Sequence, residues 1–234
     1  MIAGLFMAVA LAFASIIVAG AWTRISESQV INVTGSAHKD VRSDLAVWRA
    51  SFSTEATTLL DAHKQLKSDS AKVESFLHAA NQNNYLLQPV QVSPVVERTK
   101  TENGEVARRV GYRIVQCIEV RSSDVETLPK LAGNAAQLIE QGVTLSSDGI
   151  NFIYTKAGEA KIEMMAEATK DARNRAEQIA AQGGRTIKEL RAARVGVVQI
   201  NPIYSSATSW EGNSDTSSLE KTITTTVTAT FSLK

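Results

Sequence analysis

The chain has 234 residues, of which 25 are basic, 24 are acidic and 44% are hydrophobic. This near-neutral balance excludes the basic surface that nucleic-acid binding requires, and it argues against a charged polymeric substrate. The apolar fraction is that of a globular protein with a sizeable core. The single cysteine, Cys117, excludes an internal disulfide, and its place within a predicted strand favours a small buried hydrophobe over a redox thiol.

The first segment of the chain, residues 1–22, contains no charged side chain. As a helix, residues 2–22 would span a bilayer core of about 30 Å, so we predict that residues 1–23 form an uncleaved transmembrane anchor. A cleaved signal segment is the alternative, because residues 19–21 (Ala-Gly-Ala) match a signal peptidase site. Arg24 alone does not decide the orientation. The predicted anchor residues are Leu5, Phe6, Leu11, Phe13, Ile16, Ile17 and, at the interface, Trp22.

The remaining body, residues 29–234, is predicted to contain sub-regions of about 43–155 and 157–234. The first strand is expected at 29–38. In the next strand, 43–55, alternating apolar residues from Ala46 to Phe52 predict one core face. Helical spacing follows at 57–81, then a strand at 86–99 that Pro89 and Pro94 place at an edge or interrupt with a bulge. A long strand at 106–121, a helix from about 124 to 141 and a strand at 149–155 complete a ferredoxin-like β-α-β-β-α-β pattern.

The second sub-region begins with the longest predicted helix, residues 157–182, which Gly183 and Gly184 end. A β-hairpin is expected from strands at 193–204 and 221–231, joined by a loop at 205–220 that is longer than hairpin closure requires. The fold class is therefore α+β, with antiparallel sheets and helices packed on one face. The apolar stripe predicted on the long helix consists of Ile162, Met165, Thr169, Ala172, Ala176 and Ile179.

Metal and catalytic sites are not indicated by the polar residues. His63 and His78 lie fifteen positions apart on one helix, more than about 20 Å, which is too far to share a metal; His38 lies on or beside the first strand. The carboxylates of Asp40, Asp44 and Asp61 could form an acid–base pair, but Asp at turns and helix starts more often binds backbone N–H groups. We predict no catalytic residue, no metal and no cofactor.

Two features favour contact with another chain. The threonines of the last strand, Thr222, Thr224, Thr226 and Thr228 among them, share one face, which either pairs with a neighbouring subunit or is an ordinary solvated face. Trp210 lies in the middle of the long loop and is either an interface anchor or a residue folded back on its own domain.

Several short motifs resemble those of the SIMPL-domain family of bacterial envelope proteins. The hallmark helix is similar to residues 166–180, followed by the two glycines and a strand. Residues 33–37 (Val-Thr-Gly-Ser-Ala), residues 44–47 (Asp-Leu-Ala-Val) and the pair Gly111-Tyr112 agree in order and spacing. Two departures are Ser43, where the family often has proline, and the helix that follows Asp124.

The resemblance implies an extracytoplasmic protein that self-associates into a ring-like or cage-like homo-oligomer, with a loose link to envelope stress tolerance and no established catalytic residues. We therefore expect a non-enzymatic, single-pass inner-membrane protein with its body in the periplasm. Its expected partners are the lipid bilayer and further copies of itself. The alternative is a periplasmic module that binds a small ligand or a partner protein without catalysis; a hydrolase lacks a recognisable nucleophile and base.

Overall fold

A computed structural model describes residues 12–20, 29–101 and 104–234. Residues 12–20 are helical and exposed, and they include the predicted anchor residues Phe13, Ile16 and Ile17. Within the described residues, no helix has the length and apolar character needed to cross a membrane. The other predicted anchor residues, Leu5, Phe6, Leu11 and Trp22, lie outside the described part of the chain.

The chain forms two compact units. Unit 1 consists of residues 1–40, 156–214 and 222–234, and unit 2 consists of residues 41–155 and 215–221. The backbone therefore passes from one unit to the other four times, after residues 40, 155, 214 and 221. The two predicted sub-regions meet near the second of these positions.

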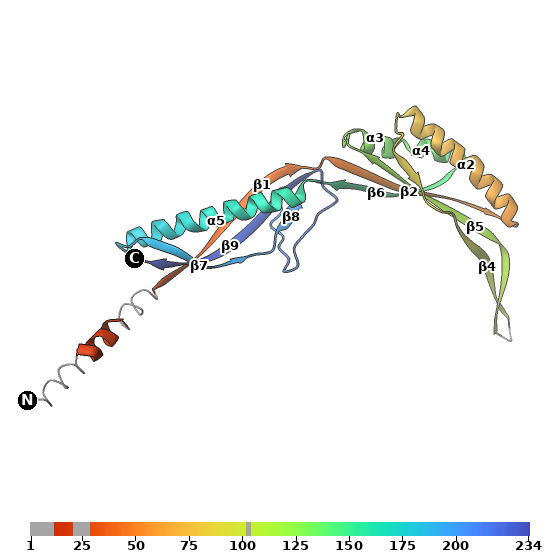
Figure 1. Cartoon of the computed structure of the whole chain (residues 1–234). Helices are drawn as coiled ribbons and strands as arrows, with labels where there is room; N and C mark the ends of the chain where they lie inside the picture. Colours follow the sequence, from red (N-terminus) through yellow and green to blue (C-terminus); the bar gives the residue numbers. More distant parts are fainter. Residues whose placement is uncertain (1–11, 21–28, 102–103) are drawn as a thin grey trace, which may run out of the picture. The chain divides into compact units, whose positions relative to one another are not determined.

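The sheet of unit 2 has five antiparallel strands: β2 (Leu45–Ala56), β3 (Tyr85–Leu87), β4 (Gln91–Thr101), β5 (Gly104–Ser122) and β6 (Thr144–Ile153). The strand order is β3-β5-β2-β6, with β4 also paired to β5 (Figure 1). The strand predicted at 86–99 is two strands, β3 and β4, because the chain leaves the ladder around Pro89. A register shift between Val95 and Val96 adds a bulge to β4.

Helices cover one face of this sheet. Ala46, Trp48, Ala50 and Phe52 of β2 are all buried there, which confirms the predicted alternation. They pack with α2 (Leu59–Ala79), α3 (Thr127–Asn134) and α4 (Ala136–Glu140) in one apolar core. The helix predicted from 124 to 141 is thus interrupted at Ala135, which lies between α3 and α4.

The sheet of unit 1 has four strands: β1 (Val30–Arg42), β7 (Ile187–Val195), β8 (Gln199–Pro202) and β9 (Glu220–Leu233). Its order is β1-β9-β7, and β8 also pairs with β9. The prediction of a single strand at 193–204 is wrong, because residues 196–198 interrupt it and separate β7 from β8. Gly196 lies so close to β9 that an added Cβ would be 2.4 Å from Thr226 Oγ1.

Helix α5 (Ala157–Gln182) packs along this sheet and has the predicted bounds (Figure 1). Its buried stripe, however, repeats every four residues and is almost entirely alanine. Ile162 and Ile179, predicted to be part of it, are 68% and 55% exposed. The reason is a close approach to β1: a Cβ added to Gly35 would lie 2.2 Å from the backbone oxygen of Ala168. The buried residues are Ala160, Met164, Ala168, Ala172, Ala176 and Ala180.

The close contact at Gly35 predicts the effect of a single methyl group. Gly35→Ala should lower the free energy of unfolding by about 1–3 kcal/mol, because the methyl group would collide with the α5 backbone. Gly158→Ala is the matched control in the same unit, since no atom lies within 4 Å of its added Cβ. It should be neutral or slightly stabilising. Urea denaturation followed by circular dichroism measures both, and equal stabilities would contradict the close packing.

Candidate interaction surfaces

A buried amide fixes the part of the long loop that carries Trp210. Gln199, on β8, donates from Nε2 to the backbone oxygen of Ser209 at 2.7 Å. Its Oε1 accepts from the backbone N–H groups of Ser209 and Asn213, at 3.2 and 2.9 Å. One side chain therefore holds both ends of the turn formed by residues 209–213. Because the amide is buried, these bonds replace those that its polar atoms would otherwise make with water.

A second amide supports the neighbouring part of the loop. Asn201, also buried on β8, donates from Nδ2 to the backbone oxygen of Ala207 at 2.7 Å. Its Oδ1 accepts from Asn213 Nδ2 at 2.9 Å. The loop is thus ordered by side-chain hydrogen bonds, although its composition of Ser, Gly, Asn and Thr is typical of flexible segments.

Two aromatic side chains project from this ordered loop. Trp210 is 85% exposed and Tyr204 is 96% exposed. Tyr204 also has a positive φ of 67°, which is uncommon for a residue other than glycine and indicates strain that the surrounding structure maintains. Trp210 is thus largely exposed, and its contact with another chain stays a prediction.

Residues 215–221, which comprise the end of the loop and the start of β9, belong to unit 2 and contain a buried ion pair. Lys221 is 1% exposed. Its Nζ donates to the backbone oxygens of Phe152 at 2.9 Å and Asp215 at 2.5 Å, and it lies 3.4 Å from Asp215 Oδ2. The Asp215 carboxylate also accepts from the backbone N–H groups of Ser217 and Ser218 and from the Ser217 hydroxyl.

The pKa values of Asp215 and Lys221 are both shifted in this environment. Burial raises the pKa of Asp215, but the hydrogen bonds from Ser217 and Ser218 and the charge of Lys221 outweigh it and lower that pKa to about 2. Burial lowers the pKa of Lys221, and Asp215 offsets part of this effect. The hydrogen bond from Lys221 to the backbone oxygen of Phe152 anchors this segment to β6.

The threonine face of β9 is accompanied by polar groups of β1. Thr222 donates to Asp40 at 2.6 Å and Thr230 to Asn32 at 2.5 Å, while Thr228 and Thr34 share a hydrogen bond of 3.0 Å. Because β9 is hydrogen-bonded to β1 on one side and to β7 on the other, it cannot pair edge-on with another chain along the stretches beside those strands. Contact through the face, including Thr224 and Thr226, stays a prediction.

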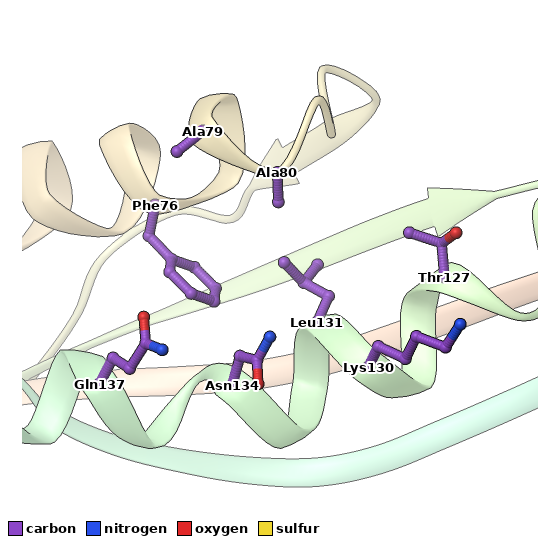
Figure 2. Close-up of a pocket in the computed structure, with 8 residues that line it drawn as sticks. All are labelled: Phe76, Ala79, Ala80, Thr127, Lys130, Leu131, Asn134 and Gln137. Atoms are coloured by element: carbon purple, nitrogen blue, oxygen red, sulfur yellow. The ribbon is translucent and has the colours of Figure 1, made fainter.

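A groove lies in unit 2 between the end of α2 and helices α3 and α4, with a volume of about 390 Å³. Figure 2 shows Phe76 pointing from α2 towards the other two helices and Leu131 pointing towards α2. Its floor contains the buried Leu131 and the half-buried Phe76, and the exposed polar groups Lys130, Asn134 and Gln137 lie at its rim. The lining residues are Phe76, Ala79, Ala80, Thr127, Lys130, Leu131, Asn134 and Gln137.

Four of the polar residues considered as catalytic or metal-binding groups have local partners, whereas His38 and His63 are exposed. His78 contacts Asn83 Oδ1 at 2.8 Å and the Tyr85 hydroxyl at 3.3 Å. Asp44 accepts from the backbone and the hydroxyl of Thr155. Asp61 completes the N-terminal cap of α2 with Thr58, and Asp40 accepts from Thr222 as described above. Within the described residues, no group of three or more His, Cys, Asp or Glu side chains could hold a metal ion.

A buried carboxylate on the other face of the unit 2 sheet is also paired. Glu119 accepts from Arg49 at 2.8 Å and from Arg121 at 2.6 Å, and these hydrogen bonds lower its pKa. With two arginines bound, Glu119 is a poor general base, and we assign it a structural role. Cys117, two positions away on β5, is partly buried.

These observations describe a protein of two α+β units with an ordered aromatic loop and a separate groove. The chain belongs to the SIMPL family, described as proteins of unknown function (DUF541), which matches residues 31–231. No curated protein matches the chain.

Similarities to solved structures are partial. The de novo designed protein Foldit4 is 14% identical, covering 45% of this chain and 94% of its own, with a TM-score of 0.23. An amidase (hydantoinase/carbamoylase family) from Burkholderia phymatum is 9% identical, covering 52% of this chain and 32% of its own, with a TM-score of 0.31. A hydantoinase/carbamoylase family amidase from Burkholderia ambifaria is 15% identical, covering 46% of this chain and 28% of its own, with a TM-score of 0.25. The chain spans about a third of either amidase, and these likenesses carry no argument about activity.

Sequence reasoning identified the loop and Trp210 but missed the groups that hold them and the groove. The amides of Gln199 and Asn201 lie in a strand, where polar residues ordinarily face solvent. The run Asp215-Thr-Ser-Ser is typical of a turn and could have predicted the Asp215 hydrogen bonds. The sequence does not predict the contact between Lys221 and Asp215, because Lys221 is also positioned by its hydrogen bond to Phe152 of β6.

The Asp215 carboxylate predicts a pH-dependent stability. Its pKa is lowered from 3.8 to about 2, so it stabilises the folded state above about pH 5, and this contribution is lost as the pH falls through 2. Asp215→Asn should therefore lose on the order of 2 kcal/mol of unfolding free energy at pH 7. The difference from the wild type should shrink between about pH 5 and pH 2 in urea titrations. The exposed Asp148→Asn is the control, and a pH-independent difference for Asp215→Asn would contradict the assignment.

Proposed function

We propose that this chain is a membrane-anchored extracytoplasmic protein of the cell envelope that assembles with copies of itself into a ring-like or cage-like homo-oligomer. In this proposal the uncharged segment at residues 1–23 is a single-pass anchor in the inner membrane, and the body, whose unit 2 is a ferredoxin-like domain, lies in the periplasm. No catalytic step is included. A role in envelope stress tolerance is part of the same proposal and rests on the family resemblance alone.

The observation that carries the self-assembly proposal is the exposed, hydrogen-bonded aromatic loop. Large aromatic side chains are enriched at interface hot spots, where they bury a large area with few rotatable bonds. A loop that is already ordered loses less conformational entropy on binding. Trp210 is held at both ends of its turn by Gln199, so its position is fixed before any partner arrives.

The second candidate is a non-catalytic module that binds a small ligand or a partner protein. The groove beside α2 favours it, because its volume of about 390 Å³ lies in the range of ligand sites and its floor is apolar with a polar rim. A defined compound that raises the melting temperature of the full chain at saturating dose would support this alternative.

Trp210 provides the test of self-assembly. The variant Trp210→Ser should reduce the molar mass of the detergent-solubilised full chain in light scattering, because the aromatic contact is lost. Thr208→Ser, an exposed change in the same loop, should leave the mass unchanged. An oligomer of unchanged mass in the Trp210 variant would remove the loop from the interface, and a monomeric wild type at high concentration would overturn the proposed assembly.

Localisation is tested by a reporter enzyme that is active only outside the cytoplasm, fused after Lys234. We expect activity from the full chain, since residues 1–23 would direct the body across the membrane. The same fusion without residues 1–23 is the control and should be inactive. An inactive full-length fusion would contradict the extracytoplasmic location, whereas an N-terminus that begins near residue 22 would replace the anchor with a cleaved signal segment.

A further inference from the structure

The groove between α2 and helices α3 and α4 has unused binding groups. Asn134 and Gln137 lie on its rim, and within the described residues neither side chain has a hydrogen-bond partner. Lys130 likewise forms no hydrogen bond or ion pair in the described part of the chain. The pKa of Asp124 is lowered mainly by hydrogen bonds from Thr127 and Glu126, and Lys130 contributes only its nearby charge. The groove therefore offers an apolar floor, two amides and one cation.

The loop of unit 1 offers the complementary groups. Trp210 presents a large apolar surface and an indole N–H. The described residues leave most of this side chain exposed. Glu211 follows it directly and is exposed; its backbone N–H bonds to Ser209, while its carboxylate has no partner among the described residues. An indole matches an apolar groove with amide acceptors, and a carboxylate matches Lys130.

We propose that Trp210 of one copy of this chain docks into the groove of a second copy, with Glu211 beside Lys130. This inference rests on the proposed self-assembly and specifies its contact. A second copy is favoured over a small ligand or an unrelated protein because its own loop carries an apolar side chain for the groove and a carboxylate for Lys130. The second copy supplies both the aromatic group and the carboxylate.

The contact restricts how copies can assemble. The loop and the groove are different patches, one in each unit, so two copies joined by a single contact still have one free loop and one free groove between them. Further copies can add through these free patches until the rotation between copies closes a ring, or they continue as a filament. In a two-fold dimer the same contact would form twice, with each loop in the groove of the other copy.

The experiment uses the full chain in detergent with one defect on each side of the contact. Trp210→Ser removes the loop anchor, and Ala79→Arg blocks the groove at an exposed position of α2. Each variant alone should lose the large species in light scattering. A mixture of the two should form a one-to-one complex, because the first keeps an intact groove and the second keeps an intact loop. Ala71→Arg, exposed on α2 but not lining the groove, is the matched control and should assemble normally.

Charge reversal provides a second measurement that does not depend on blocking the groove. Lys130→Glu should weaken association on the order of tenfold, and combining it with Glu211→Lys should restore it. Assembly that survives both Ala79→Arg and Lys130→Glu, but not Trp210→Ser, would overturn this contact while leaving self-assembly through the loop intact. The absence of a complex in the mixture, with both variants folded by circular dichroism, would also overturn it. A monomeric wild type would instead contradict the proposed function.

Discussion

The hydrogen bonds of Gln199 determine whether this molecule has a defined recognition element at all. Without them, residues 203–214 would be a polar segment with no apolar core of its own, and the position of Trp210 would vary. With both amide atoms bound to Ser209 and Asn213, the turn has a fixed geometry. The cost of burying a polar amide in β8 is offset by hydrogen bonds to the backbone of Val197, Ser209 and Asn213.

The contact between α5 and β1 illustrates which parts of the fold local sequence can predict. The bounds of α5 follow from helix propensity and the terminal glycines, and the core face of β2 follows from the alternation of Ala46, Trp48, Ala50 and Phe52, so both predictions are confirmed. The side of α5 that is buried depends instead on its distance from Gly35. Hydrophobicity alone selected Ile162 and Ile179, whereas the close approach admits alanine.

The interaction surfaces were less predictable from the sequence, because they too depend on how separate elements pack together. Trp210 was recognisable because a large aromatic residue is unusual in a polar loop. The groove, by contrast, combines residues of α2 with residues about fifty positions later, and the break between α3 and α4 at Ala135 helps to shape it. Such a site becomes visible only when the helices are packed. The strand break at residues 196–198 was likewise not predicted from the local pattern.

The strand order of unit 1 has a consequence for biosynthesis. Its first strand, β1, lies next to β9, the last strand of the sheet in sequence, so the sheet cannot close until β9 has been made. Unit 2, built mostly from the continuous residues 41–155, has no such requirement for most of its chain. During translation, β1 and the alanine face of α5 are therefore made before the central strand that completes their sheet. A premature stop that removes β9 would leave them permanently exposed to proteases.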